Sequence, residues 1–492
     1  MDQIDSLQHK KFFGEVALVA LAQWLPKIEG FVILPFIVGL LGVGQYGIWS
    51  QISVTIALVY PFSALGICTA MKRFLPGKTE SEVKNDFWAA VLFISITSFV
   101  LAILLFILSP IVVSLFFKSA GALLLLRISA ILIPLTILNQ LFLDVFIIFG
   151  QSKRYSILIL GKETVEMVLL IYFLLHGGGL MSVVIISIFS LLVVNLIAFF
   201  MYLKKIGLGL PKMKTLSPYL ELGIPVFLSG ISYWFITFSS RYIIGYFLNI
   251  KLVGVYSCVY MLTTIVPMLS GPIWLVLLPA ISKFWENGQI NNVKKYLEYS
   301  FKYFLILCVP AVFGLTVLGR QFLQLLVGKD FIGYWFLIPI IGIALMIYQK
   351  VQLDEYVLIL AKKSSIILRY TVLSAIVSVI FGIMLVPLFG LTGAALSNLF
   401  AYIFYAIIIF FESRKYLTYN FDVKFLFKSV ASSLIMGFPI FLLNPQGPLF
   451  TVLSIIVGAL AYVGLLFLMG GINIEEVKIL FKSSKLKNEF GK

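Results

Sequence analysis

The sequence predicts an all-α, polytopic membrane protein with about 14 transmembrane helices, and three observations predict this class. Of its 492 residues, 61% are hydrophobic and only 12% are charged, against about 45–50% and about 25% in soluble proteins. The mean hydropathy is +1.07, so a soluble fold would lack the polar residues to cover its surface. Apolar runs of membrane-spanning length recur along the whole chain. A soluble enzyme, a disordered protein and a secreted disulfide scaffold are therefore disfavoured.

The apolar runs have the helical length, roughly 20 residues or more, that crosses a bilayer core of about 30 Å. They cover residues 12–41, 45–71, 87–117, 120–149, 155–176, 180–203, 218–248, 252–282, 299–327, 331–360, 365–388, 391–413, 425–443 and 449–470. Several contain proline, which membrane helices tolerate because neighbouring groups satisfy the freed backbone carbonyl. No run alternates with a period of two, so membrane-spanning strands are excluded.

The formal net charge is +16, from 37 basic and 21 acidic residues. If the N-terminus is cytoplasmic, 29 of the 37 basic residues lie on the cytoplasmic side, four on the outer side and four within spans. Such a bias is the positive-inside pattern. It predicts both termini in the cytoplasm, an even number of spans and a place in the cell (cytoplasmic or inner) membrane. The basic excess then reflects topology, and no nucleic-acid partner is expected.

The two halves of the chain contain an internal repeat. Residues 47–50 (Gly-Ile-Trp-Ser) match residues 254–257 (Gly-Val-Tyr-Ser), 207 positions later. Further matches keep the same order at offsets of 205 to 211 positions, such as 132–134 with 337–339. This pattern predicts a six-helix N-terminal lobe (1–217), its repeat (218–417), and helices 13 and 14 with a basic cytoplasmic tail (418–492). Parallel repeats are typical of transporters that bind substrate between their lobes.

These motifs resemble the polysaccharide-transport, O-antigen (Wzx-type) flippases of the multidrug/oligosaccharidyl-lipid/polysaccharide exporter superfamily. The residues that carry the resemblance are 41–50, 63–67, 73–74, 223–225, 241–245, 254–257, 278–282 and 390–395. The resemblance covers about 40–415 and implies two six-helix lobes facing each other in a V. Such proteins typically carry Asp just before the Arg241-Tyr-Ile-Ile-Gly element. Here Ser240 takes that place, so the role of that Asp as counter-ion or coupling site does not carry over.

Charged residues inside the spans are the main candidates for function, because such residues are costly and usually face a cavity or a partner. Lys27 in span 1 and Arg241 in span 7 lie in equivalent spans of the repeat, so both lobes can direct a cation at a central cavity. Two such cations suit an anionic lipid pyrophosphate. The predicted substrate-binding residues are Lys27, Arg241, Gln23, Tyr233, Thr237 and Arg127. Two alternatives stay open: Lys27 pairs with Glu29, and Arg127 reaches the outer interface.

A second group of polar residues concerns coupling. Lys350 and Asp354 are spaced i,i+4 in span 10 and can form an ion pair, whereas the alternative is a proton- or sodium-coupling site. The candidates for ion coupling or gating are Glu29, Asp144, Lys350, Asp354 and Glu355. Glu163 and Glu166, beside Lys162 in span 5, are interpreted as a solvated gate. No other cofactor is expected.

Several motifs that could suggest nucleotide or metal binding lack the context that such binding requires. Gly42-x-Gly44-x-x-Gly47 fits a dinucleotide fingerprint, but that motif needs a preceding strand, and here it predicts a tight turn on the outer face. No ATP-binding GxxxxGK[ST] pattern occurs. Two isolated histidines and three dispersed cysteines lack metal-ligand spacing, so neither a metal site nor a catalytic residue is expected.

The sequence therefore predicts a non-enzymatic flippase that moves an isoprenoid (undecaprenyl) pyrophosphate-linked oligosaccharide to the outer leaflet by alternating access. The product would serve O-antigen, capsule or related polysaccharide biosynthesis. Expected partners are membrane lipids, this substrate, a polysaccharide polymerase and glycosyltransferases. Two alternatives stay open: a cation-coupled multidrug or small-molecule exporter of the same architecture, and a non-transporting scaffold for glycan assembly.

Overall fold

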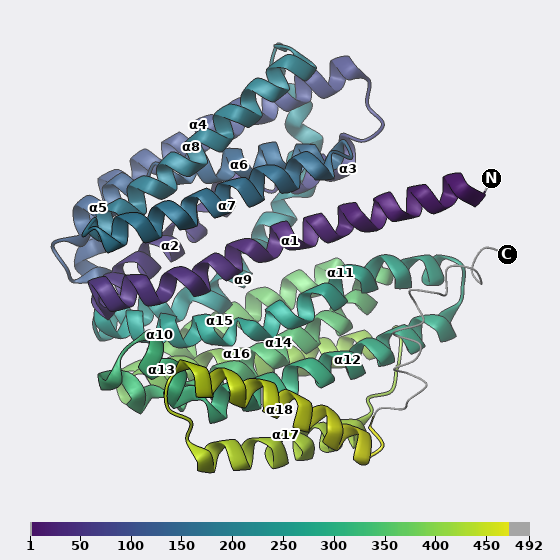
Figure 1. The fold of residues 1–492 in the computed structure, drawn as a ribbon. Helices are drawn as coiled ribbons and strands as arrows, with labels where there is room; N and C mark the ends of the chain where they lie inside the picture. Colours follow the sequence, from purple (N-terminus) through teal and green to yellow (C-terminus); the bar gives the residue numbers. More distant parts are fainter. Residues whose placement is uncertain (1, 472–492) are drawn as a thin grey trace. The chain divides into compact units, whose positions relative to one another are not determined.

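The computed structural model describes residues 2–471, and this part of the chain is helical with no strand (Figure 1). The helices are α1 (Asp2–Leu41), α2 (Val43–Ala64), α3 (Ile67–Phe74), α4 (Glu80–Val112), α5 (Ala122–Ser129), α6 (Leu132–Ile148), α7 (Ser152–Leu175), α8 (Gly179–Ile206), α9 (Ser217–Phe247), α10 (Ile250–Thr263), α11 (Ile265–Glu286), α12 (Ile290–Val317), α13 (Gly319–Leu326), α14 (Leu337–Leu360), α15 (Ser364–Phe389), α16 (Leu391–Arg414), α17 (Val423–Leu443) and α18 (Pro448–Leu468). Short turns of other helix types span Val113–Phe117, Met213–Leu216 and Lys329–Tyr334. The all-α prediction is confirmed.

In the described range, twelve helical segments are long and apolar enough to cross a membrane, and the bent pair of α2 and α3 makes thirteen. The pair bends by 48° where Leu65 and Gly66 adopt positive φ angles of 44° and 75°. The expected span over 155–176 is α7, which is long enough but carries three charged residues within its apolar part. The expected span over 252–282 is divided between α10 and α11 at Thr264.

The chain forms two compact units. Unit 1 comprises the residues up to Cys258 together with Ser365–Tyr405, and unit 2 comprises Val259–Ser364 and the residues from Ala406 onward. Within unit 1, α7 packs against α1 and α8, and α6 packs against α4 and α8. Within unit 2, α12 packs against α11, α14 and α17, and α18 lies along α17 (Figure 1). The lobe boundaries at 217 and 417 stay a prediction.

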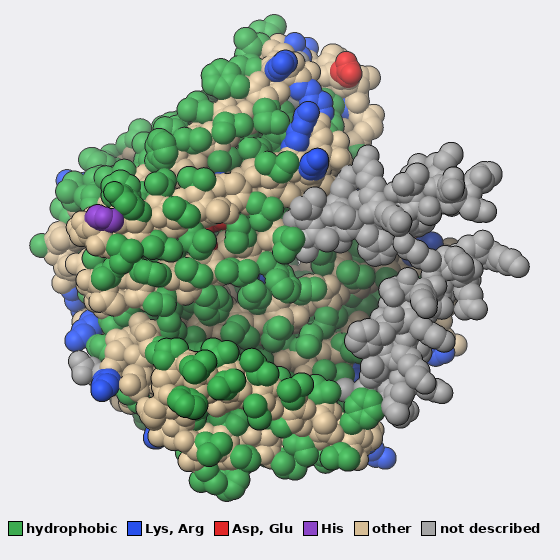
Figure 2. Space-filling model, viewed as in Figure 1, with side chains coloured by type: hydrophobic (Ala, Val, Ile, Leu, Met, Phe, Trp, Pro, Cys, Tyr) green, Lys and Arg blue, Asp and Glu red, His purple; other side chains and the backbone are tan. Residues whose placement is uncertain are grey.

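The helix sides carry an unusually apolar surface. Large apolar side chains are exposed along them, such as Ile107 at 64% and Leu468 at 85%. On the face drawn in Figure 2, apolar side chains cover the helix sides, and Lys and Arg gather toward helix ends. A soluble protein would hide such a surface, whereas lipid tails solvate it. Length, composition and surface together establish a multi-pass membrane protein.

Candidate functional site

The most concentrated group of charges lies in unit 1, where α1, α7 and α8 meet. Carboxylate oxygens of Glu29 (α1), Glu163 and Glu166 (α7) all lie within 4.8 Å of one another, and all three residues are buried. Lys162 Nζ lies 3.0 Å from Glu163 Oε1 and 2.8 Å from Glu166 Oε2. We call these four residues the Glu-Lys cluster. The solvated gate expected at Glu163 and Glu166 is wrong, because neighbouring helices cover both side chains.

Two hydroxyl groups of α8 complete this cluster. Ser187 Oγ donates to Glu166 Oε1 at 2.7 Å, and Ser190 Oγ donates to Glu166 Oε2 at 2.6 Å. Three carboxylates around one ammonium carry a net negative charge unless a proton or a cation joins them. Because the carboxylate oxygens lie within 4.8 Å of one another, their mutual repulsion favours uptake of a proton or a cation. The cluster is therefore a candidate site for proton or cation binding.

Two further acids occupy equivalent positions of the repeat. Leu143-Asp144 in α6 and Leu353-Asp354 in α14 are 210 positions apart, within the range of offsets that defines the repeat. Asp144 accepts a hydrogen bond of 2.8 Å from Gln140 Nε2 and an ion pair of 2.9 Å from Lys72 of α3. Each acid thus has a polar partner one turn earlier in its own helix, Gln140 for Asp144 and Lys350 for Asp354.

In unit 2, a segment between α16 and α17 covers Asp354. The Tyr419 hydroxyl donates to Asp354 Oδ1 at 2.8 Å. Burial, and then the charge of Asp354, raise the pKa of Tyr419 well above its usual range, so the phenol keeps its proton. The Lys350 ammonium lies 4.5 Å from the ring centre of Phe421 and 4.9 Å from that of Phe410, within cation–π range. Glu355, the next residue of α14 after Asp354, is half-buried.

The predicted cavity cations have different surroundings. Lys27 is exposed on α1, and it forms no ion pair with Glu29 among the described residues. Arg241 is only 5% exposed, and its Nε donates to Ser257 Oγ at 3.0 Å. Arg127 Nε donates to Ser109 Oγ at 3.1 Å, with its guanidinium 4.9 Å from the Phe106 ring centre.

The remaining cavity candidates are Tyr233, which is 40% exposed, and Thr237, which is buried. Gln23 lies in α1, but its side chain is outside the described residues. Within the described part of the chain, no hydrogen bond or ion pair joins Lys27 to Arg241 or to Arg127, so a substrate cavity built from these cations stays a prediction.

Ser240, which stands where the resemblance leads us to expect Asp, belongs to a neutral network. Ser240 Oγ donates to Asn398 Oδ1 at 2.8 Å, and Ser378 Oγ approaches the same oxygen at 3.4 Å. Asn398 Nδ2 donates to the Tyr256 hydroxyl at 3.1 Å. These buried groups satisfy one another without a charge and hold α9, α10, α15 and α16 together within unit 1. This position therefore supplies no carboxylate.

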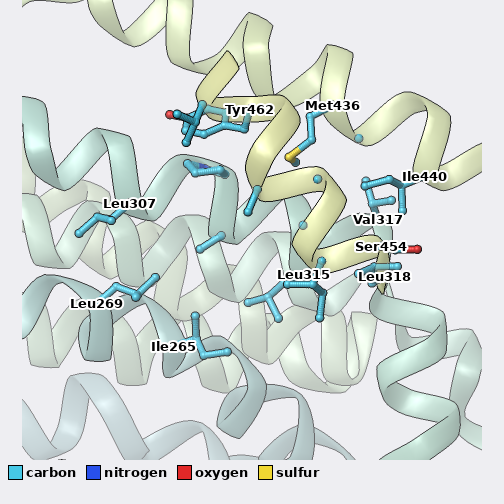
Figure 3. A pocket seen from close by; sticks show the side chains of 18 of the residues that line it. Ile265, Leu269, Leu307, Leu315, Val317, Leu318, Met436, Ile440, Ser454 and Tyr462 are labelled. Carbon is cyan, nitrogen blue, oxygen red and sulfur yellow. The ribbon is translucent and has the colours of Figure 1, made fainter. Parts of the chain in front are cut away.

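An apolar pocket of about 470 Å³ lies in unit 2 between α11, α12, α17 and α18 (Figure 3). Leu269, Leu307 and Leu315 point into it from α11 and α12, and Met436 and Tyr462 border it from α17 and α18. Among its lining residues only Ser454 and Tyr462 bear a polar side-chain atom, and the Tyr462 hydroxyl is hydrogen-bonded to Ser429 at 2.8 Å. The pocket therefore suits a hydrocarbon chain.

Sequence reasoning missed the residues that complete these sites. Ser187, Ser190, Lys72, Tyr419 and Asn398 reach their partners across helices, and no local spacing reveals such contacts. A signal did exist for the Glu-Lys cluster: acids occur in two apolar spans, at Glu29 and at Glu163 and Glu166, where isolated charges are costly.

The fold and these buried polar groups define the class of protein as an all-α, multi-pass membrane protein with charged groups buried among its helices. The chain matches the polysaccharide biosynthesis protein family over residues 37–335 and belongs to that family. This finding confirms the family to which the resemblance pointed.

Among curated proteins, the chain is 23% identical over 358 residues to a probable low-salt glycan biosynthesis flippase, Agl15, of Haloferax volcanii, covering 65% of this chain and 73% of the relative. It is 23% identical over 161 residues to a probable flippase, AglR, of the same organism, covering 32% of this chain and 33% of that relative. The fold resembles the lipid II flippase MurJ in an inward closed conformation, with a TM-score of 0.73, 16% identity, and coverage of 96% and 100% of the two chains. It also resembles an inward-facing multidrug resistance MATE family transporter, with a TM-score of 0.65, 15% identity, and coverage of 79% and 94%.

Proposed function

We propose that this chain is a flippase for a lipid-linked glycan. Its substrate would be an oligosaccharide linked through pyrophosphate to an isoprenoid lipid, and its mechanism would be alternating access. The apolar pocket of unit 2 carries this proposal. A transporter of water-soluble cargo has no need of a hydrocarbon-lined pocket among its membrane helices, whereas a flippase has to hold a lipid tail while the headgroup crosses. Two of the curated relatives are named as probable flippases, which supports the same conclusion.

The headgroup would move through a cationic path in the cell membrane, with both chain termini in the cytoplasm. Lys27 and Arg241 would contact its pyrophosphate in turn, because Arg241 is buried in the conformation described and becomes accessible only if α9 moves. Arg binds phosphate oxygens through two parallel hydrogen bonds, while Lys acts as a point charge. A polymerase and glycosyltransferases would act before and after this step, since the glycan must be built on the lipid and then extended.

The Glu-Lys cluster would couple transport to an ion gradient. Its three carboxylates around one ammonium permit protonation or cation binding, and α1, α7 and α8 all contribute residues to it. A change in its charge would therefore alter how these helices pack. The same cluster favours a second candidate function, export of an organic cation. A cation exporter would need acids in its substrate path, and the cluster supplies buried acids near α1.

The proposed function is tested with purified protein in liposomes that contain a fluorescent isoprenoid-pyrophosphate oligosaccharide. Accessibility of the headgroup to a membrane-impermeant quencher reports flipping. We expect the double variant Lys27→Ala and Arg241→Ala to slow flipping at least about tenfold, or about 1.4 kcal/mol. The matched control is Lys212→Ala with Lys214→Ala, which removes two exposed cations before α9.

The outcomes separate the candidate functions. If the parent chain moves the fluorescent lipid no faster than empty liposomes do, the flippase proposal is overturned. An organic-cation exporter or a scaffold would then remain, and transport of a fluorescent cation in the same liposomes would distinguish these two. A double variant that keeps the parent's unfolding temperature and flips at the parent's rate would overturn the cationic path. Because Arg241 is buried, Arg241→Lys is the second variant: it retains charge and should flip faster than Arg241→Ala.

A further inference from the structure

Glycines at equivalent positions of the repeat pack against each other's helix. A Cβ atom added to Gly47 of α2 would overlap the carbonyl oxygen of Ile250, and one added to Gly254 of α10 would overlap the carbonyl oxygen of Val43. Ile250 and Gly254 follow Val43 and Gly47 by 207 positions, so the same contact is made twice with the roles exchanged. Such reciprocity is the mark of a two-fold axis, and here it passes between α2 and α10.

Hydrogen bonds near this axis also join the first repeat to the second. Ser50 Oγ donates to Ser257 Oγ at 2.7 Å, and these two residues are again 207 positions apart. The Thr55 and Tyr242 hydroxyl groups lie 2.6 Å apart, and Trp234 Nε1 donates to the Val54 carbonyl at 3.1 Å. All these contacts lie within unit 1. In the orientation that the basic residues predict, they lie in the outer halves of α2, α9 and α10.

The energetics of this contact suit reversible opening. Small residues let helices approach closely, but each hydrogen bond between membrane helices contributes little net stability. Gln51, one residue after Ser50, is fully buried and its amide makes no hydrogen bond within the described structure. A buried, unsatisfied amide destabilises the closed packing, and water would satisfy it when the helices separate. The closed contact is thus specific in geometry without being strongly stabilised.

A second close contact lies at the other end of α2 and α9. Gly66, in the bend between α2 and α3, lies so close to Gly223 of α9 that an added Cβ atom would overlap the Gly223 backbone. We propose that the outer ends of α2, α9 and α10 form a gate, closed by Gly47, Ser50, Gly254 and Ser257, which separates while the Gly66–Gly223 contact acts as the pivot. Separation of the helices uncovers Arg241, which is hydrogen-bonded to Ser257 in the closed state.

This proposal rests on the proposed function only in so far as a transporter must open outward, and its first test requires no substrate. Cys258 is a native reporter: it is fully buried and follows Gln51 by 207 positions in the repeat. A wedge at Gly47 should hold the gate open. Gly47→Leu should therefore speed modification of Cys258 by a membrane-impermeant maleimide added outside intact cells, by about tenfold, or about 1.4 kcal/mol. Peptide mass spectrometry assigns the modified residue.

The matched control is Gly44→Leu, one turn earlier in α2, where an added Cβ atom meets nothing within 4 Å. It should leave the Cys258 rate at the parent value, and Cys68 should stay unmodified in both variants as a check against general unfolding. Equal Cys258 rates in Gly47→Leu and Gly44→Leu would overturn the gate. So would equal acceleration at Cys68.

A cross-link provides the opposite perturbation. The pair Ser50→Cys and Ser257→Cys, with Cys258→Ser, should form a disulfide under mild oxidation and stop flipping until it is reduced. Asn139→Cys with Asn195→Cys is the control pair, since these side chains are hydrogen-bonded at 3.1 Å within the first repeat and should cross-link without effect. If the gate pair does not cross-link, or if lipid flipping is unchanged after cross-linking, the gate is overturned. If the parent chain never flips the lipid, the proposed function is overturned, but the result of Cys258 labelling still stands.

Discussion

Lys72 of α3 and Asp144 of α6 form an ion pair of 2.9 Å in which the lysine side chain is 46% exposed and the carboxylate only 6% exposed. The equivalent acid of the second repeat, Asp354, is enclosed by Lys350 of its own helix and by Tyr419. Half-exposed pairs contribute about 0–1 kcal/mol to stability, whereas removing one member of a buried pair costs about 3–5 kcal/mol. Equivalent acids of the repeat therefore have unequal structural roles.

This inequality predicts different effects for one substitution at two sites. Asp144→Asn should lower the free energy of unfolding by less than about 1 kcal/mol, because solvent can stabilise the released Lys72. Asp354→Asn should lower it by about 3 kcal/mol, because Lys350 is left charged and largely buried. Denaturant unfolding of the purified protein in detergent micelles measures both, and each variant serves as the control for the other. Equal losses would show that the Lys72 pair is as enclosed as its counterpart.

Tyr419 should stabilise the segment between α16 and α17 through its hydroxyl group alone. Tyr419→Phe removes the hydrogen bond to Asp354 and keeps the ring, so it should cost about 1.5–3 kcal/mol, as expected for a bond to a charged group. Because the pKa of Tyr419 is raised well above its usual range, the hydroxyl stays a donor at mildly alkaline pH and the loss should not shrink there. Tyr416→Phe, at an exposed tyrosine three residues earlier, is the matched control and should be neutral; similar losses in both variants would contradict this role.

Local spacing was enough to predict part of this architecture. Hydrophobic run lengths predict the spans, because a membrane helix is defined by its own sequence. The i,i+4 spacing of Lys350 and Asp354 predicts their ion pair, because residues four apart are neighbours on a helix. Equivalent motifs 207 positions apart predict a repeat, although nothing in them shows that Ser50 and Ser257 bond to each other.

Contacts between helices were beyond such reasoning. Lys72 meets Asp144 only because α3 bends away from α2 and packs on α6. Glu29 lies two residues from Lys27, which places the two side chains on opposite sides of α1, so Glu29 joins the acids of α7 instead of the nearby cation. The burial of Glu163 and Glu166 depends likewise on the packing of α1 and α8 against α7, which a single sequence does not encode in any local pattern.

The apolar pocket of unit 2 gives a direct test of tail binding. Gly314 lines the pocket, and an added Cβ atom there meets nothing within 4 Å, so Gly314→Phe should fill the space without disturbing the backbone. Flipping of an isoprenoid-linked substrate should slow about tenfold, and photo-cross-linking of an isoprenoid probe to α17 and α18 should fall in parallel. Gly464→Phe in α18 is the control, since Gly464 also has open space around it but does not line the pocket. Normal probe cross-linking in Gly314→Phe would place the tail elsewhere.

The Glu-Lys cluster predicts how flipping responds to an imposed ion gradient. Glu166 accepts bonds from Ser187, Ser190 and Lys162, and Glu166→Gln keeps its size while removing a group that can gain and lose a proton. In liposomes with a pH or sodium gradient, the parent should flip faster in one direction of the gradient, and Glu166→Gln should flip at the rate seen without a gradient.

The matched control for this experiment is Glu221→Gln, because Glu221 is an exposed acid of α9 and its neutralisation should leave the response intact. Running pH and sodium gradients separately distinguishes the two ions, since a proton-coupled cluster responds to pH alone at constant sodium. Should Glu166→Gln keep the full response of the parent, the cluster is a structural anchor of α1 on α7. In that case its loss should appear as a lower free energy of unfolding, because Lys162 would lose one of its two buried carboxylate partners.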